Sequence, residues 1–174
     1  MKRPVAGYDA EMIDHLSVPV RDVEATARTY AQALAPIGYS VQMSLTRAQY
    51  PQMPYSQMVA LGVKGKPDLW LRPAQQAVDP THLALRVQHR KEVDAFHVAA
   101  LAAGLTDDGG PGVRQHYHAH YYAAFVRDAD GHSLEVVCHA PPPVAAKKAP
   151  APARKAKKPA KKPAARKPVA RKRR

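Results

Sequence analysis

The sequence predicts an α+β fold made of two copies of one βαβββ module, followed by a disordered basic tail. Three observations support this prediction. Residues 14–39 align without a gap with residues 81–106, an offset of 67. Each of these segments has the alternating apolar pattern of a strand and then the apolar stripe of a helix. The composition also changes abruptly near residue 140.

The first module begins with a strand in which Leu16, Val18 and Val20 alternate with other residues. Asp22 is a suitable N-cap for the helix that follows. The apolar stripe of that helix consists of Val23, Ala27, Tyr30 and Leu34. Residues 39–45, 56–63 and 68–72 then supply three strand-like segments, which complete a βαβββ unit.

The second module repeats this order, with Leu83, Leu85 and Val87 alternating in its first strand. Its helix carries Val93, Phe96, Ala100 and Leu101 on one face and ends at Gly104. A glycine-rich connection follows, and residues 121–126 and 132–139 are strand-like. The sequence "RDADG" joins these two strands and predicts a hairpin turn with Asp130-Gly131 at its tip.

The chain is predicted to have three parts: an N-terminal extension (1–11), one folded domain (12–139) and a tail (140–174). The tail contains 14 Lys and Arg residues, no acidic residue, and otherwise only Ala, Pro and two Val. Such a segment repels itself and has no large apolar residues with which to build a core. The remaining residues carry a net charge of −1, so the basic character of the protein belongs to its tail.

The sequence also favours a cytoplasmic location. Cys138 is the single cysteine, so an intrachain disulfide is excluded. The N-terminal residues contain no apolar run of signal-peptide length, and no segment is long enough to span a bilayer. We therefore expect a cytoplasmic protein without a membrane partner, associated with the nucleoid if its tail binds DNA.

Three strands each place a metal-ligand side chain on the face turned away from the helices. His15, His82 and Glu135 alternate with the apolar residues of their strands and therefore lie on that face. Two histidines and one carboxylate can hold a divalent ion and leave positions open for a substrate. The pattern does not distinguish Fe, Mn, Zn and Ni. Alternatively, the histidines form hydrogen bonds within the sheet and Glu135 is a surface charge.

Residues 12–39, "THLALRV" and "FVRDADGHSLEVV" resemble the vicinal oxygen chelate superfamily of glyoxalases, bleomycin-resistance proteins and extradiol dioxygenases. The resemblance covers about residues 12–139, and its most specific part is the Asp-x-Asp-Gly turn followed by Glu135. It implies two modules whose curved sheets form an open eight-stranded barrel around a metal held at His15, His82 and Glu135.

Glyoxalase I would carry a fourth ligand where this chain has Leu69 or Trp70. Asp68 lies nearby in the sequence, in an uncertain register. The resemblance therefore implies a three-ligand site, as in the metal-dependent dioxygenases and the fosfomycin-resistance thiol transferases.

The segment "GVRQHYHAHYYAAF" places His116, His118 and His120 at alternate positions, which would share one face of a strand. A second metal site there is the weaker interpretation, because no further ligand is identified and the modules already account for a site elsewhere. The segment borders the cavity of the fold that the chain resembles. Its candidates are His116 and Tyr121 for substrate contact, with His118, Tyr122 and Glu135 for catalysis; an exposed loop is equally compatible. Trp70, also compatible with core packing, and Arg86 are further candidates for substrate contact.

Two functions of the domain remain open. The first is a divalent-metal-dependent enzyme, either a lyase or isomerase or a dioxygenase, that acts on a small oxygen-bearing substrate. The second is a ligand-sequestering protein of the bleomycin-resistance type, which needs no protein-bound metal. We also expect a homodimer, because unpaired sheet edges are a liability. The tail resembles those of linker histones and is expected to bind DNA or RNA through charge alone; the domain would then serve as an adaptor.

Overall fold

A computed structural model of the chain describes residues 13–142. The chain divides into two units, residues 1–142 and 143–174. The predicted N-terminal extension and nearly all of the predicted tail therefore lie outside the described residues. Within the described part, no helix has the length and apolar character needed to cross a membrane.

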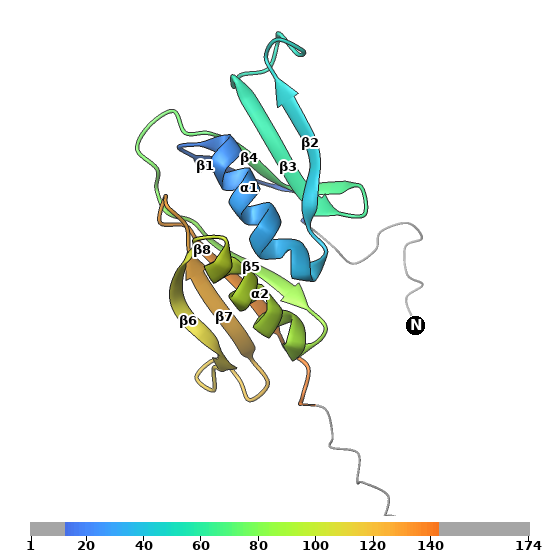
Figure 1. Ribbon diagram of the computed structural model, residues 1–174, viewed down its shortest axis with the longest axis vertical. Coiled ribbons are helices and arrows are strands. Elements are labelled where there is room, and N and C mark those ends of the chain that lie inside the picture. Colours follow the sequence, from blue (N-terminus) through green and yellow to red (C-terminus); the bar gives the residue numbers. More distant parts are fainter. Residues whose placement is uncertain (1–12, 143–174) are drawn as a thin grey trace, which may run out of the picture. The chain divides into compact units, whose positions relative to one another are not determined.

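Two modules with the same element order make up the described chain (Figure 1). The first contains β1 (Leu16–Val20), α1 (Val23–Leu34), a short 3₁₀ helix (Ala35–Ile37), β2 (Ser40–Thr46), β3 (Gln57–Val63) and β4 (Lys66–Pro73). The second contains β5 (His82–Val87), α2 (Arg90–Ala102), β6 (Thr106–Val113), β7 (Tyr122–Arg127) and β8 (Ser133–Cys138). The predicted pair of βαβββ modules is confirmed.

Each module forms its own four-stranded mixed sheet. The strand orders are β1-β4-β3-β2 and β5-β8-β7-β6, and in both sheets the first strand of the module runs parallel to the last. Among the described strands, no backbone pairing joins one sheet to the other. The eight strands of the fold are therefore shared equally between two sheets of identical topology.

The internal repeat appears in the helix boundaries. α1 begins at Val23 and α2 at Arg90, which preserves the offset of 67 residues. The Asp22 carboxylate accepts a hydrogen bond from the Ala25 backbone N–H at 2.9 Å, as expected of an N-cap. Gly104 follows α2 with φ of 93°, a left-handed conformation that glycine adopts without strain. The predicted N-cap of the first helix, Asp22, and the predicted end of the second helix at Gly104 are thus confirmed.

The local sequence does not predict that β6 is a strand. Its residues, Thr-Asp-Asp-Gly-Gly-Pro-Gly-Val, lack an alternating apolar pattern and were expected to form a connection. They pair with β7 through their backbone, with irregularities on both sides of Gly109, where φ is 147°. A strand held by backbone pairing at a sheet edge needs no apolar side chains, so its sequence carries little signal.

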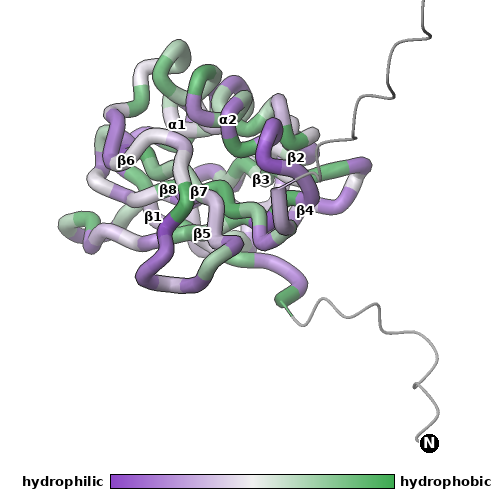
Figure 2. Tube along the Cα trace, turned by 90° about the horizontal axis from the view of Figure 1, so that it is seen from below, coloured by the Kyte–Doolittle hydropathy of each residue, from purple (hydrophilic) through white to green (hydrophobic). Residues whose placement is uncertain are grey.

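Both helices lie on the same side of the two sheets (Figure 2). α1 packs on β3, α2 packs on β7, and the helices also pack against each other. Val18 and Val20 are buried on the helix side of β1, whereas Ser17, which precedes Val18, is exposed. We call the face of each sheet turned away from the helices its open face.

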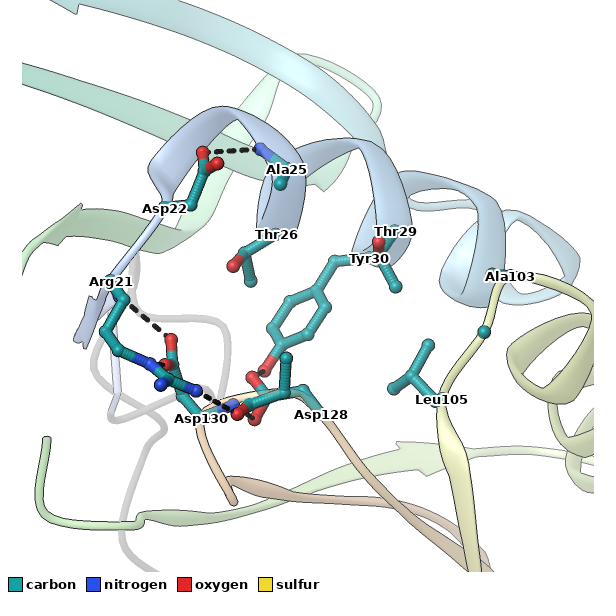
Figure 3. A pocket seen from close by; sticks show the side chains of 12 residues that line it. Arg21, Asp22, Ala25, Thr26, Thr29, Tyr30, Ala103, Leu105, Asp128 and Asp130 are labelled. Carbon is teal, nitrogen blue, oxygen red and sulfur yellow. Dashed lines mark hydrogen bonds and ion pairs between the residues drawn. The ribbon is translucent and has the colours of Figure 1, made fainter.

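The turn between β7 and β8 fastens the second module to the first (Figure 3). One Asp128 carboxylate oxygen accepts a hydrogen bond from the Tyr30 hydroxyl of α1 at 2.6 Å. The other accepts from the backbone N–H groups of Asp130 and His132 at 2.9 and 2.8 Å. Burial raises the pKa of Tyr30, and Asp128 raises it further, which keeps the phenol a neutral donor.

Two further residues of this turn bind the end of β1. The Asp130 carboxylate accepts from the Arg21 backbone N–H at 2.9 Å and also pairs with the Arg21 guanidinium. His132, only 1% exposed, donates from Nε2 to the Pro19 carbonyl at 2.9 Å. Its Nδ1 accepts from the Thr81 backbone N–H at 2.9 Å. The turn is therefore a hydrogen-bonded clamp between the modules.

We expect Asp128→Ala to lower the free energy of unfolding by about 2–3 kcal/mol, because it leaves the buried Tyr30 hydroxyl without its acceptor. Urea denaturation measures the change. Asp108→Ala is the control: Asp108 forms a partly exposed ion pair with Arg127 at 3.0 Å, and its loss should cost less than about 1 kcal/mol. Equal losses in the two variants would contradict the role of the clamp.

Candidate functional site

His82 and Glu135 meet on the open face of the second sheet. β5 and β8 are parallel neighbours, and their register sets Ala84 opposite Glu135. The Nε2 atom of His82 lies 3.0 Å from Oε2 of Glu135, and its Nδ1 lies 3.1 Å from the Ser133 hydroxyl. The His82 side chain is 53% exposed, but that of Glu135 is only 3% exposed. A buried carboxylate therefore contacts an imidazole that is exposed on the open face.

Glu135 is buried between a histidine and a tyrosine side chain. Within residues 13–142, its ion-pair partner is His82, and no lysine or arginine pairs with it. The Tyr121 hydroxyl donates to Oε1 at 2.5 Å. Burial raises the pKa of Tyr121, and its bond to Glu135 raises it further, so that the phenol stays protonated. Both oxygens of the buried carboxylate are therefore hydrogen-bonded, and a divalent cation could take the place of the hydrogen between Oε2 and His82.

His15, the third predicted ligand, does not form a group of ligand atoms with this pair in the part of the chain that the structure describes. It precedes β1, and its Nδ1 lies 2.9 Å from the Asp14 carboxylate, with both side chains exposed. Within the described chain, His15, His82 and Glu135 do not bring three ligand atoms within 4.8 Å of one another. A single chain therefore brings together two of the three predicted ligands.

Trp70 occupies in the first sheet the position that Glu135 occupies in the second. Ser17 of β1 stands opposite Trp70 of β4, as Ala84 of β5 stands opposite Glu135 of β8. Ser17 and Ala84 also correspond in the repeat, so the register selects Trp70 rather than Leu69 as the counterpart of the carboxylate. The two open faces thus differ chemically at equivalent positions.

The clamp contains the one group of three potential metal ligands that the described residues bring within 4.8 Å: Asp128, Asp130 and His132. Both ring nitrogens of His132 already bond to backbone groups. The Asp128 carboxylate accepts hydrogen bonds from Tyr30 and from its own turn, and the Asp130 carboxylate accepts one from Arg21. An ion would have to displace these bonds, so we interpret the group as structural.

The histidine-rich segment is a loop between β6 and β7, and one of its histidines joins the surroundings of Glu135. The His120 backbone N–H donates to Nδ1 of His118 at 3.1 Å, so His118 carries its proton on Nε2. That proton is donated to Nδ1 of His139 at 2.9 Å. Burial lowers the pKa of His139, and His118 lowers it further, which favours the accepting, neutral ring. Both rings contact the Tyr121 ring edge-on.

The other predicted site residues lie elsewhere. Tyr122 is on the helix side of β7: its hydroxyl donates to Asp94 at 2.7 Å, and Arg90 lies over its ring. It therefore does not join the group around Glu135. The His116 ring contacts the Tyr117 ring in a tilted arrangement, with ring centroids 4.3 Å apart. Arg86 is exposed on the open face of β5.

Sequence reasoning missed the role of His139. It lies 21 residues from His118, at the end of β8, and no local pattern relates the two residues. The alternation of β8 placed Glu135 correctly, but it could not show which loop residues fold over that strand.

Comparison with solved structures identifies the fold. A glyoxalase/bleomycin resistance protein from Albidiferax ferrireducens is 22% identical over 74% of this chain and 98% of its own, with a TM-score of 0.57. A glyoxalase/bleomycin resistance protein/dioxygenase domain from Frankia is 18% identical over 75% and 98%, also with a TM-score of 0.57. The oxidase ChaP-H1 is 23% identical over 74% and 96%, with a TM-score of 0.51.

No protein-family model and no curated protein sequence matches the chain. The chain is therefore similar in fold to the glyoxalase/bleomycin resistance/dioxygenase proteins, as its sequence predicted. This class contains both enzymes and resistance proteins, so the fold alone does not distinguish the two functions and the residues of the site have to be considered.

Proposed function

We propose that the protein is a divalent-metal-dependent enzyme of the glyoxalase/dioxygenase type, acting on a small oxygen-bearing substrate. The observation that carries the proposal is the pair of His82 and Glu135 on adjacent strands at an open face. Two ligands that each lie about 2.1 Å from one ion are separated by about 3.0 Å in octahedral geometry and about 3.4 Å in tetrahedral geometry. The 3.0 Å between Nε2 and Oε2 is close to these separations, so an ion could replace the hydrogen between the two atoms.

We propose further that His15 of a second copy completes the site. In the repeat, His15 corresponds to His82, so each module has a histidine at or just before the start of its first strand. A two-fold dimer that lays the first sheet of one copy over the second sheet of the other would cover both faces. It would also supply the third ligand, which a single chain keeps away from His82 and Glu135.

The bound ion would polarise a substrate oxygen as a Lewis acid. The residues of this chain hold and orient the site. Tyr121 fixes one oxygen of Glu135 and leaves the other directed toward His82. His118, paired with His139 against the Tyr121 ring, is placed to accept or supply a proton beside that carboxylate.

Tyr121→Phe should lower metal affinity about 10- to 100-fold, because partners that orient a ligating carboxylate typically contribute that much. Titration with zinc or manganese, followed by calorimetry, measures the change. Tyr117→Phe is the matched control: Tyr117 packs on Tyr121 but is 59% exposed, and in the described part of the chain the hydroxyl that bonds to Glu135 is that of Tyr121. Similar affinities for both variants would show that the phenol does not orient the ligand.

A non-catalytic, ligand-sequestering protein is the second candidate for the domain. A hollow on the open face of the first sheet, whose lining includes Trp70, Leu45 and Met58, supports it, because a sequestering protein needs a pocket and no metal. Metal content separates the two candidates. Stoichiometric divalent metal that depends on Glu135 supports the enzyme, and metal-free protein that binds a ligand tightly supports sequestration.

We propose that residues 140–174 add a nonspecific affinity for nucleic acid. The proposal rests on 14 cations and no acidic residue in this stretch, beside a domain whose net charge is −1. Cations on such a chain bind phosphates by releasing counterions and do not read the base sequence.

A further inference from the structure

We propose that the hollow beside Trp70, on the open face of the first sheet, binds a neutral planar aromatic molecule. The hollow has a volume of about 400 Å³, of the size that small-molecule sites occupy. Strands β1 to β4 and the loop after β2 contribute its lining: His15, Ser17, Leu45, Tyr50, Gln52, Met53, Met58 and Trp70.

The lining selects the chemical class of the ligand. Trp70 and Tyr50 offer aromatic rings, for which offset or edge-to-face contact with another ring is favourable. Met53 and Met58 add polarizable thioethers, which also make favourable contacts with rings. Among residues 13–142, no carboxylate, lysine or arginine lines the hollow, so a charged ligand would lose hydration there without gaining a carboxylate, lysine or arginine as counter-ion.

The register of the sheet leaves room beside the indole. The residues opposite Trp70 on its two neighbouring strands are Ser17 and Ala60, both small. At the equivalent place in the second sheet, Glu135 is covered by Tyr121 and His82. The first sheet therefore presents an aromatic surface where the second presents a metal-binding carboxylate.

This inference adds a substrate class to the proposed function. It rests on that function in one respect, namely that the bound molecule is taken to be the substrate. In the proposed dimer, the hollow and His15 of one copy would face His82 and Glu135 of the other. An aromatic ring held at Trp70 would then present an oxygen substituent toward the metal ligands. Binding itself requires no metal.

The test uses Trp70 as its own reporter, because it is the single tryptophan of the chain. Its indole N–H gives one resonance in a ¹H–¹⁵N NMR spectrum of the full chain. The protein is treated with a chelator and titrated with 1-naphthol, with decahydro-1-naphthol as a saturated control and 1-naphthalenesulfonate as an anionic one. We expect a saturable shift with 1-naphthol and much weaker responses to both controls.

Two matched variants locate the binding. Leu45→Lys puts a charge into the hollow and should weaken 1-naphthol binding about tenfold or more. Leu101→Lys makes the same change on α2, where Leu101 is 41% exposed, and should leave the affinity unchanged. If Leu45→Lys does not fold, Trp70→Leu serves in its place, with binding measured by calorimetry, and should show the same loss.

Three outcomes would overturn the inference: no shift with 1-naphthol, an equal shift with its saturated analogue, or equal affinities in the Leu45 and Leu101 variants. A Trp70 resonance that changes only with protein concentration would also overturn it, because a second copy would then fill the hollow. Since the protein is metal-free throughout, failure here is distinguishable from failure of the metal site.

Discussion

Replacing Glu135 with glutamine should abolish stoichiometric metal binding and leave the fold intact. Glutamine keeps the shape of the side chain and can still accept the Tyr121 hydrogen bond, but it lacks the anionic oxygen that faces His82. The affinity should fall by more than the roughly 10- to 100-fold expected for a residue that only orients a ligand. His82→Ala should give the same result, because it removes the other half of the pair.

Element analysis of protein purified without a histidine tag measures this effect. His116→Ala is the control, since His116 is exposed in the loop and its ring contacts that of Tyr117. Its metal content should match that of the wild type. Equal metal in the Glu135 and His116 variants would rule out the site, and a loss in the His116 variant would assign a ligand to the loop.

The second large effect concerns residues 140–174. Their removal should abolish binding to duplex DNA without changing the fold or the metal content, because the remaining residues carry a net charge of −1. If about 6 to 10 tail cations contact phosphates, the affinity of the intact protein should fall about a thousandfold or more between about 50 and 200 mM salt. Base sequence should have little influence, since the tail offers no aromatic side chain to stack on bases.

Fluorescence anisotropy of labelled duplex DNA, titrated with full-length and truncated protein at several salt concentrations, tests this prediction. Undiminished binding by the truncated chain would assign the affinity to the domain. An affinity of the full-length protein that is independent of salt would also contradict it, because charge is the mechanism that this sequence provides.

The sequence predicted the features that depend on alternation within a strand or on the repeat. Val18, Val136 and Glu135 lie on the predicted faces, because successive side chains of a strand point to opposite sides. The repeat also predicted where α2 begins. These features are local, so one stretch of chain contains all the information they need.

Features set by contacts between distant segments were not predictable. β6 owes its existence to backbone pairing with β7 and has no apolar pattern. The placing of His118 against His139 depends on how the loop after β6 folds back over β8. The separation of His15 from His82 depends on how the two modules pack, which alternation within strands does not determine.

The central claim is that two copies of the chain build one metal site, and subunit complementation tests it most directly. His15→Ala and Glu135→Gln should each fail to bind metal alone. A hybrid dimer of the two variants contains one site with His15 from one copy and with His82 and Glu135 from the other. In an equal mixture that exchanges subunits freely, about half of the dimers are hybrids, and each hybrid has one of its two sites intact. The mixture should therefore recover about a quarter of the wild-type metal content. No recovery in a mixture shown to contain hybrid dimers, or full metal content in His15→Ala alone, would contradict the account.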